Sequence, residues 1–87
     1  MKEFKDLEFK DLPDDRGIQC RIQFENGFGA SIVNGPYING GAVGLYELAV
    51  LDADGEIHYD NVVANGDVRG YLNEDGVTTL LAEIQNL

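Results

Sequence analysis

The sequence has 87 residues, 44% hydrophobic and 25% charged, and its sixteen acidic and six basic residues give a net charge of −10. This size and composition predict one folded domain over residues 1–87, with too thin a core for a catalytic cavity, so we do not expect an enzyme. The negative surface repels phosphate backbones and anionic membranes, so we expect no direct binding to nucleic acid or membrane, and a basic protein as partner.

The charge is concentrated in the later part of the chain. Residues 1–21 carry five basic and six acidic side chains, a net of −1, whereas residues 22–87 carry ten acidic side chains and only Arg69, a net of −9. Cys20 is the single cysteine, which excludes an intramolecular disulfide and the usual structural zinc site, and we expect no cofactor or metal. No apolar run approaches the roughly 20 residues of a membrane span, and the first residues do not resemble a signal peptide, so we expect a cytoplasmic protein.

The chain begins with a tandem repeat, because Glu3–Leu7 and Glu8–Leu12 are both Glu-Phe-Lys-Asp-Leu. Five residues are too few for a solenoid repeat, so the duplication is interpreted as a lengthened terminal strand or an arm over residues 1–7. We expect a short strand from Phe9 onward, and we expect Phe4 and Leu7 either to pack locally or to mediate self-association. The segment Pro13–Gly17 has the composition of a turn.

A β-hairpin is predicted next. Apolar and polar residues alternate from Ile18 to Phe24, which places one side of a strand toward a core. The dipeptide Asn26-Gly27 is a strong hairpin signal, and the returning strand is expected from Phe28 to Val33. The side chains predicted to point inward are those of Ile18, Cys20, Ile22, Phe24, Phe28, Ala30 and Ile32.

The second half of the chain predicts further strands and one helix. After a glycine-rich loop over residues 34–44, the nearly continuous apolar run Leu45–Leu51 is typical of a central strand buried on both faces. A turn at Asp52–Gly55 leads to a partner strand at Glu56–Asp60, and a loop with a short helical turn, capped near Asp67, is expected over residues 62–72. Asn73 is a predicted N-cap. The apolar stripe of the final amphipathic helix contains Val77, Leu80, Leu81 and Ile84.

Together these elements predict an α+β fold, in which an antiparallel β-meander of four to five strands carries the C-terminal helix on one face.

The glycine-rich loop is the first candidate site. It lacks the GxGxxG spacing of a nucleotide-binding loop, it precedes a strand instead of a helix, and we expect no Lys or Arg near it. One interpretation is a hairpin connection that needs positive φ angles. The other is a partner-binding loop, because aromatic and amide side chains between glycines are typical of binding loops. The residues concerned are Tyr37, Asn39, Gly40 and Gly41.

An acidic row is the second candidate. The Asp52-x-Asp54-Gly55 sequence matches half of a calcium loop, but its flanks are strands, so a β-turn is the preferred interpretation. Side chains two apart on a strand are roughly 6.6 Å apart, close to the spacing of successive phosphates, so the row would mimic DNA for a basic partner. The alternative is a solvated face that keeps the protein soluble. The row consists of Asp52, Asp54, Glu56, Asp60 and Asp67.

Catalysis is not expected. His58 is the only histidine, and the serine and threonines lie in a predicted strand and helix without a nucleophile elbow. Paired carboxylates would need a walled cleft to separate their pKa values, which a small meander lacks.

The central sequence resembles a family of small acidic proteins of tailed bacteriophages. The resemblance extends over roughly residues 8–87. It rests on Phe24–Ser31, Gly35-Pro36-Tyr37, Gly40-Gly41, Gly44–Leu51, Tyr59-Asp60 and Gly70-Tyr71-Leu72. The family carries no assigned activity and no functional residues. What it implies is a viral context, in which small acidic proteins often bind and block a host enzyme or a defence complex, as anti-CRISPR and anti-restriction proteins do.

The leading hypothesis is therefore a phage accessory protein in the cytosol of a bacterial host, which inhibits a defence or nucleic-acid-processing complex. The acidic row would steer the partner and the glycine-rich loop would supply shape-specific contacts. Two alternatives stay open. One is a virion assembly protein that acts by homo-oligomerisation, and the other is a binder of a small ligand or metal.

Overall fold

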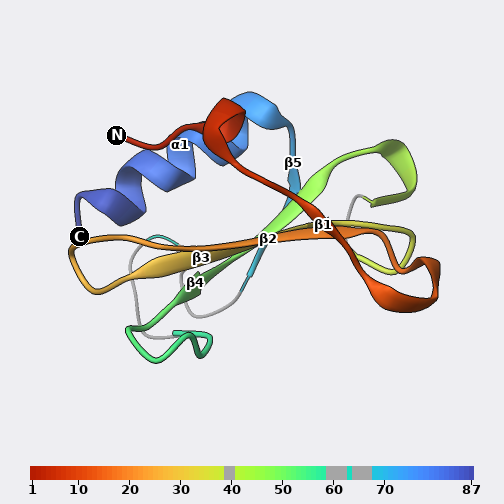
Figure 1. The fold of residues 1–87 in the computed structure, drawn as a ribbon. Coiled ribbons are helices and arrows are strands. Elements are labelled where there is room, and N and C mark those ends of the chain that lie inside the picture. Colours follow the sequence, from red (N-terminus) through yellow and green to blue (C-terminus); the bar gives the residue numbers. More distant parts are fainter. Residues whose placement is uncertain (39–40, 59–62, 64–67) are drawn as a thin grey trace.

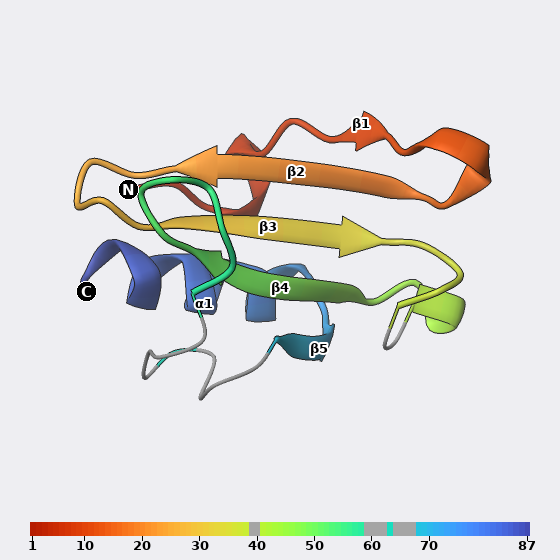
Figure 2. The ribbon, with the colours of Figure 1, turned by 90° about the horizontal axis from the view of Figure 1, so that it is seen from below.

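The computed structural model describes residues 1–38, 41–58, 63 and 68–87. An antiparallel sheet of five strands, in the order β1-β2-β3-β4-β5, carries one helix on one face (Figure 1; Figure 2), so the predicted α+β class and meander are confirmed. The elements are η1 (Phe4–Asp6), β1 (Lys10–Asp11), η2 (Pro13–Asp15), β2 (Ile18–Gln23), β3 (Gly29–Asn34), η3 (Gly41–Val43), β4 (Tyr46–Leu51), β5 (Arg69–Leu72) and α1 (Glu74–Gln85), where η denotes a 3-10 turn. No helix in this described part is long and apolar enough to cross a membrane.

The β2-β3 hairpin forms where the Asn-Gly signal predicts it. The N–H of Phe24 donates to the carbonyl of Phe28 at 2.7 Å, and Gly27 closes the turn with a φ of +89°. The side chain of Asn26 accepts from the N–H of Phe28 and also donates to the carbonyl of Ile84 at 2.8 Å. The turn is therefore tied to the end of α1.

The core lies between α1 and the sheet. Asn73 caps the helix as predicted, because its Oδ1 accepts from the N–H of Gly76 at 2.8 Å. The predicted apolar stripe of α1 is buried against the inner side chains of β3 and β4. On β4 both faces are buried from Leu48 to Leu51, also as predicted. The buried core residues are Ala30, Ile32, Leu48, Val50, Val63, Val77, Leu80, Leu81 and Ile84.

The prediction for residues 56–72 is partly wrong. Within the described residues, the expected strand at Glu56–Asp60 is reduced to a bridge between Ile57 and Leu51 and a hydrogen bond from the N–H of His58 to the carbonyl of Val50. Tyr59 and Asp60 lie outside the described residues.

The strand β5 (Arg69–Leu72) pairs with the first part of β4. The helical turn that we expected before residue 72 is therefore a strand. The physical reason is a β-bulge: Tyr46 pairs with Leu72 and Leu48 with Arg69, so Gly70 and Tyr71 face one residue of β4. Tyr71 takes a φ of +58°, and this irregularity removes the alternation that identifies a strand. Asp67, the expected cap, lies outside the described residues.

The two copies of the N-terminal repeat adopt different structures. The second copy contributes β1, whereas the first forms η1 and crosses to α1 (Figure 1). There the N–H of Phe4 donates to Oγ1 of Thr78 at 2.9 Å, and Lys2 and Gln85 exchange two hydrogen bonds of 2.9 Å. The rings of Phe4 and Phe9, one from each copy, meet Tyr46 with centroids 5.1 and 5.8 Å away. Of the two expectations for Phe4, local packing is what the structure shows.

Candidate functional site

The predicted acidic residues at the end of β4 form a compact turn, which we call the acidic turn (Asp52–Glu56). The N–H of Asp52 donates to the carbonyl of Glu56 at 2.8 Å, and that of Gly55 donates to the carbonyl of Asp52 at 3.0 Å. Oδ1 of Asp52 accepts from the N–H groups of Asp54 and Glu56 at 2.9 and 3.0 Å. The β-turn interpretation is therefore confirmed, and Asp52 acts mainly within the turn.

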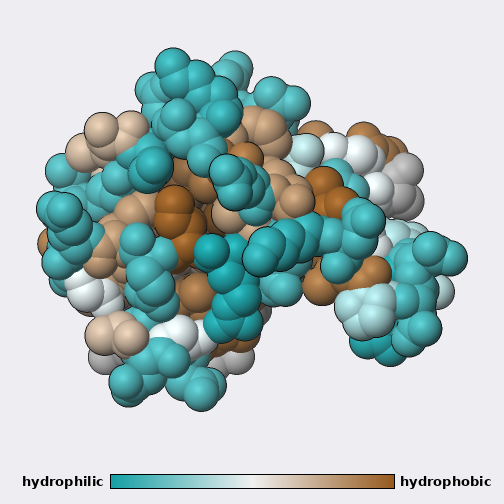
Figure 3. All heavy atoms as spheres, in the orientation of Figure 1, coloured by the Kyte–Doolittle hydropathy of each residue, from teal (hydrophilic) through white to brown (hydrophobic). Residues whose placement is uncertain are grey.

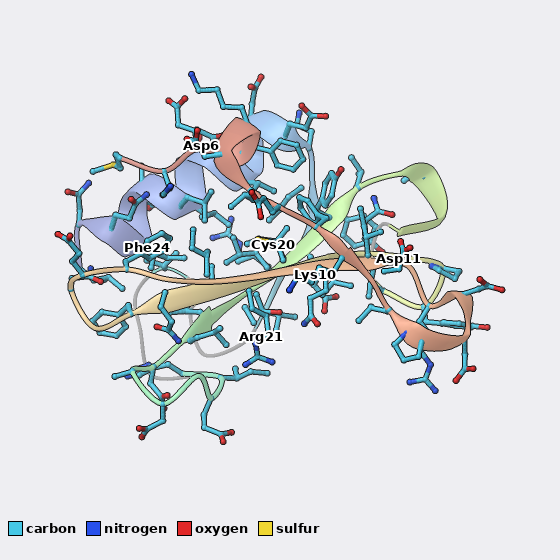
Figure 4. The ribbon with its side chains drawn as sticks, in the orientation of Figure 1. Asp6, Lys10, Asp11, Cys20, Arg21 and Phe24 are labelled. Carbon is cyan, nitrogen blue, oxygen red and sulfur yellow. The ribbon has the colours of Figure 1, made fainter. Side chains whose placement is uncertain are left out.

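The acidic turn folds over the face of the sheet opposite α1. On β2 the polar residues that alternate with the core residues point to that face, and Figure 4 shows Arg21 there, with Cys20 on the helix side. The guanidinium of Arg21 donates to the carbonyl of Gly55, and Nε2 of Gln23 donates to the carbonyl of Asp52 at 3.2 Å. Two side chains of β2 thus hold the backbone of the turn across β3.

This arrangement leaves two carboxylates directed at solvent. Asp54 and Glu56 are exposed, whereas Asp52 is half-buried. In the part of the chain that the structure describes, the one ion pair joins Lys5 and Glu3. No carboxylate of the acidic turn forms an ion pair there, and the guanidinium of Arg21 binds the turn through a backbone carbonyl. Nor do three or more His, Cys, Asp or Glu side chains there come together as a metal site. Asp54 and Glu56 therefore present negative charge on a held backbone, and the single positive charge of Arg21 offsets it only in part.

The glycine-rich loop is shaped by close backbone contact. Tyr37 is 81% exposed, and Gly41 lies so near the carbonyl of Gly35 that a Cβ atom would be 1.6 Å from that oxygen. The expectation that no basic residue lies near this loop is wrong, because Arg16 lines a hollow of about 520 Å³ together with Tyr37 and Ile38. Arg16 reaches this loop because it lies in the turn that precedes β2. Asn39 and Gly40 lie outside the described residues.

The two candidate surfaces lie at opposite ends of the sheet. Gly29 pairs with Leu51 next to the acidic turn, whereas Val33 pairs with Glu47 next to the glycine-rich loop (Figure 2). Strands of six residues separate them by about 20 Å. The structure therefore does not bring Tyr37 and Gly41 together with the acidic turn, and Asp60 and Asp67 lie outside the described residues.

A larger hollow of about 780 Å³, which sequence reasoning missed, lies at the end of the sheet that carries the acidic turn. It is bounded by the N-terminal segment, the β2-β3 hairpin and the end of α1. No local pattern predicts it, because three segments distant in sequence form it; the one signal is Phe24, the last apolar residue in the alternation of β2. Its lining consists of Met1, Lys2, Asp6, Gln23, Phe24, Glu25, Asn26 and Gln85.

Cys20 is 5% exposed, in agreement with its predicted inward position. Burial raises the pKa of its thiol, and burial together with the charge of Glu74 raises the pKa of Tyr46. Because both folded-state pKa values are raised, their contribution to stability is complete below the unfolded-state values and is lost as the pH rises through the folded-state values.

We expect the free energy of unfolding to fall with pH from about pH 8.5, where an unfolded cysteine ionises, and less steeply in Cys20→Ala. Urea unfolding of both proteins at about pH 7 and about pH 9.5 measures the two slopes. Identical slopes in the two proteins would contradict a role for the buried thiol.

Comparisons of the chain with protein-family models, with curated proteins and with solved structures gave no match. The resemblance to small acidic phage proteins therefore stays a prediction.

Proposed function

We propose that this chain is a non-enzymatic accessory protein of a tailed phage, acting in the cytosol of a bacterial host. It binds a basic host protein and inhibits a defence or nucleic-acid-processing complex. The acidic turn is the steering surface. The glycine-rich loop lies too far away to share a small epitope with it, so we assign it a separate contact on a larger partner.

The observation that carries the proposal is the pair of exposed carboxylates on Asp54 and Glu56, on a turn that Arg21 and Gln23 hold to the sheet. Among the described residues neither carboxylate forms an ion pair. Carboxylates that serve only to keep a protein soluble do not need a backbone that is fixed by side-chain hydrogen bonds. A held turn loses little conformational entropy when a partner binds, which favours recognition. Each exposed ion pair contributes only about 0.2–1 kcal/mol, so charge would act mainly on the association rate and on the choice of partner.

Affinity capture from a bacterial host lysate at about 50 mM and about 500 mM salt tests the proposal. We expect one basic, nucleic-acid-binding protein to be retained at low salt. The double variant Asp54→Lys/Glu56→Lys should bind it about tenfold more weakly at low salt, with a smaller difference at high salt.

The matched control is Glu8→Lys/Asp11→Lys, which changes the net charge equally at exposed positions outside the acidic turn. Equal losses in both double variants would show that only overall charge matters. Equal retention of the partner by all three proteins would contradict the proposal.

A further inference from the structure

The outer edge of β2 is covered over only part of its length. β1 pairs with Ile18 and Gln19, and among the residues that the structure describes no strand lies beside the rest of β2, from Cys20 to Gln23. The arm, which precedes β1 in the chain, lies on the helix side of the sheet (Figure 2). A sheet edge of this kind offers backbone donors and acceptors to an added strand.

The hydrogen bonds of the neighbouring strands show which groups point outward. Phe24 bonds with Phe28 inside the hairpin, whereas the carbonyl of Gly17 accepts from the N–H of Leu12 on the outer side. Because the direction alternates along an antiparallel strand, Arg21 and Gln23 direct their N–H and C=O groups to the outer edge. Their side chains lie on the same face as the acidic turn, to which both donate hydrogen bonds.

The larger hollow lies beside this edge on the helix side. Phe24, half-buried against the core, lines it, and the side chains of Asp6 and Glu25 at its rim are exposed. Figure 4 places Phe24 between α1 and β2, with Asp6 above it on the arm, and Figure 3 shows apolar surface in this region between polar side chains. The edge is thus flanked on one face by a hollow that Phe24 lines together with polar and charged side chains, and on the other by the acidic turn.

We propose that an extended, basic segment of a partner protein adds to the sheet as an antiparallel strand at Arg21–Gln23. The inference rests on the proposed function, because it assumes the same basic partner. Successive side chains of the added strand alternate between the faces. Apolar residues would enter the hollow at Phe24, and Lys or Arg residues would face Asp54 and Glu56, whose two negative charges outnumber the charge of Arg21 on the same face. Antiparallel pairing continues the existing sheet and is the more stable arrangement per residue.

The test is an NMR titration of the ¹⁵N-labelled full chain with the acetylated and amidated peptide Lys-Val-Lys-Val-Lys. We expect chemical-shift changes at Arg21, Gln23 and the acidic turn, and slower hydrogen exchange of the Gln23 amide. The peptide Glu-Val-Glu-Val-Glu should bind at least about tenfold more weakly.

Two singly N-methylated peptides are matched controls for the backbone hydrogen bonds. In the proposed pairing the lysine residues face the acidic turn and direct their N–H groups to β2, so N-methylation of the central lysine should abolish binding. N-methylation of a valine, whose N–H points away, should leave binding within about twofold. Glu25→Lys at the rim should weaken binding, and Asp11→Lys on β1, distant from Phe24 (Figure 4), should do so less.

Absence of binding by the lysine peptide, or equal binding by the glutamate peptide, would overturn the inference. So would equal binding by both N-methylated peptides with shifts confined to residues 53–56, but that result would leave the acidic turn as the binding surface of the proposed function. Conversely, binding at the edge together with equal capture of the host partner by all variants would sustain the edge site and contradict the proposed function.

Discussion

Replacement of Gly17 by alanine is expected to lower the free energy of unfolding by about 4 kcal/mol, from the combined cost of an unfavourable backbone conformation and overpacking. Gly17 has a φ of +116°, and a Cβ atom there would be 2.0 Å from the carbonyl oxygen of Asn34 and 2.6 Å from Cα of Gly35. These atoms are backbone, so they cannot rotate away. Since a domain of this size is stable by only about 5–15 kcal/mol, much of its stability would be lost.

Variants of two further glycines separate the cost of the backbone conformation from the cost of overpacking. Gly27 has a φ of +89°, and a Cβ atom added there would have no neighbour within 4 Å, so Gly27→Ala should cost only about 1 kcal/mol of conformational strain. Gly35→Ala tests the steric contribution, because its Cβ atom would be 2.0 Å from the carbonyl oxygen of Arg16 and its φ is not positive. Urea unfolding followed by circular dichroism measures all three. Equal losses in Gly17→Ala and Gly27→Ala would contradict the close approach of the two loops.

Replacement of Phe4 by alanine is expected to lower the free energy of unfolding by about 2 kcal/mol, less than for a fully buried phenylalanine because Phe4 is half-buried. Its ring contacts Phe9 at 5.7 Å and Tyr46 at 5.1 Å between centroids, and it packs with the core on the inner side of the arm. For a domain of this size, this loss corresponds to a decrease in Tm of about 8–16 °C. Thermal unfolding by circular dichroism would detect it.

The neighbouring variant Lys5→Ala is the control, because its side chain is 78% exposed and its pair with Glu3 is a surface ion pair. We expect its free energy of unfolding to change by less than about 0.5 kcal/mol. If Phe4→Ala changed stability no more than Lys5→Ala, the arm would not be part of the folded core.

The predictions that succeeded depend on neighbouring residues. The hairpin at Asn26-Gly27 and the helix cap at Asn73 are set by backbone preferences and hydrogen bonds within a few residues, and both form as expected. One of the predictions that failed, the helical turn before residue 72, concerns a strand whose alternation is interrupted by the bulge at Gly70 and Tyr71. A bulge is defined by its partner strand, which a single segment cannot reveal.

The candidate site divides in the same way. The sequence identified the turn at Asp52–Gly55 and named the glycine-rich loop with Tyr37 as another candidate, but it did not reveal that the sheet holds the two at opposite ends. The sequence analysis also placed Asp52 among the partner-binding residues, whereas the carboxylate of Asp52 accepts hydrogen bonds from the backbone of the turn.

By itself, then, the sequence determined the acidic charge, the fold class, the hairpin, the helix and the turn of acidic residues, because periodicity, capping and turn formation act over a few neighbouring residues. Only the tertiary structure decided that the two identical pentapeptides fold differently, since one meets α1 and the other the edge of β2. It likewise decided that Arg21 and Gln23 hold the acidic turn, and that a hollow lies beside the edge of β2. These features depend on contacts between residues far apart in the chain, which pack together only after the sheet has formed.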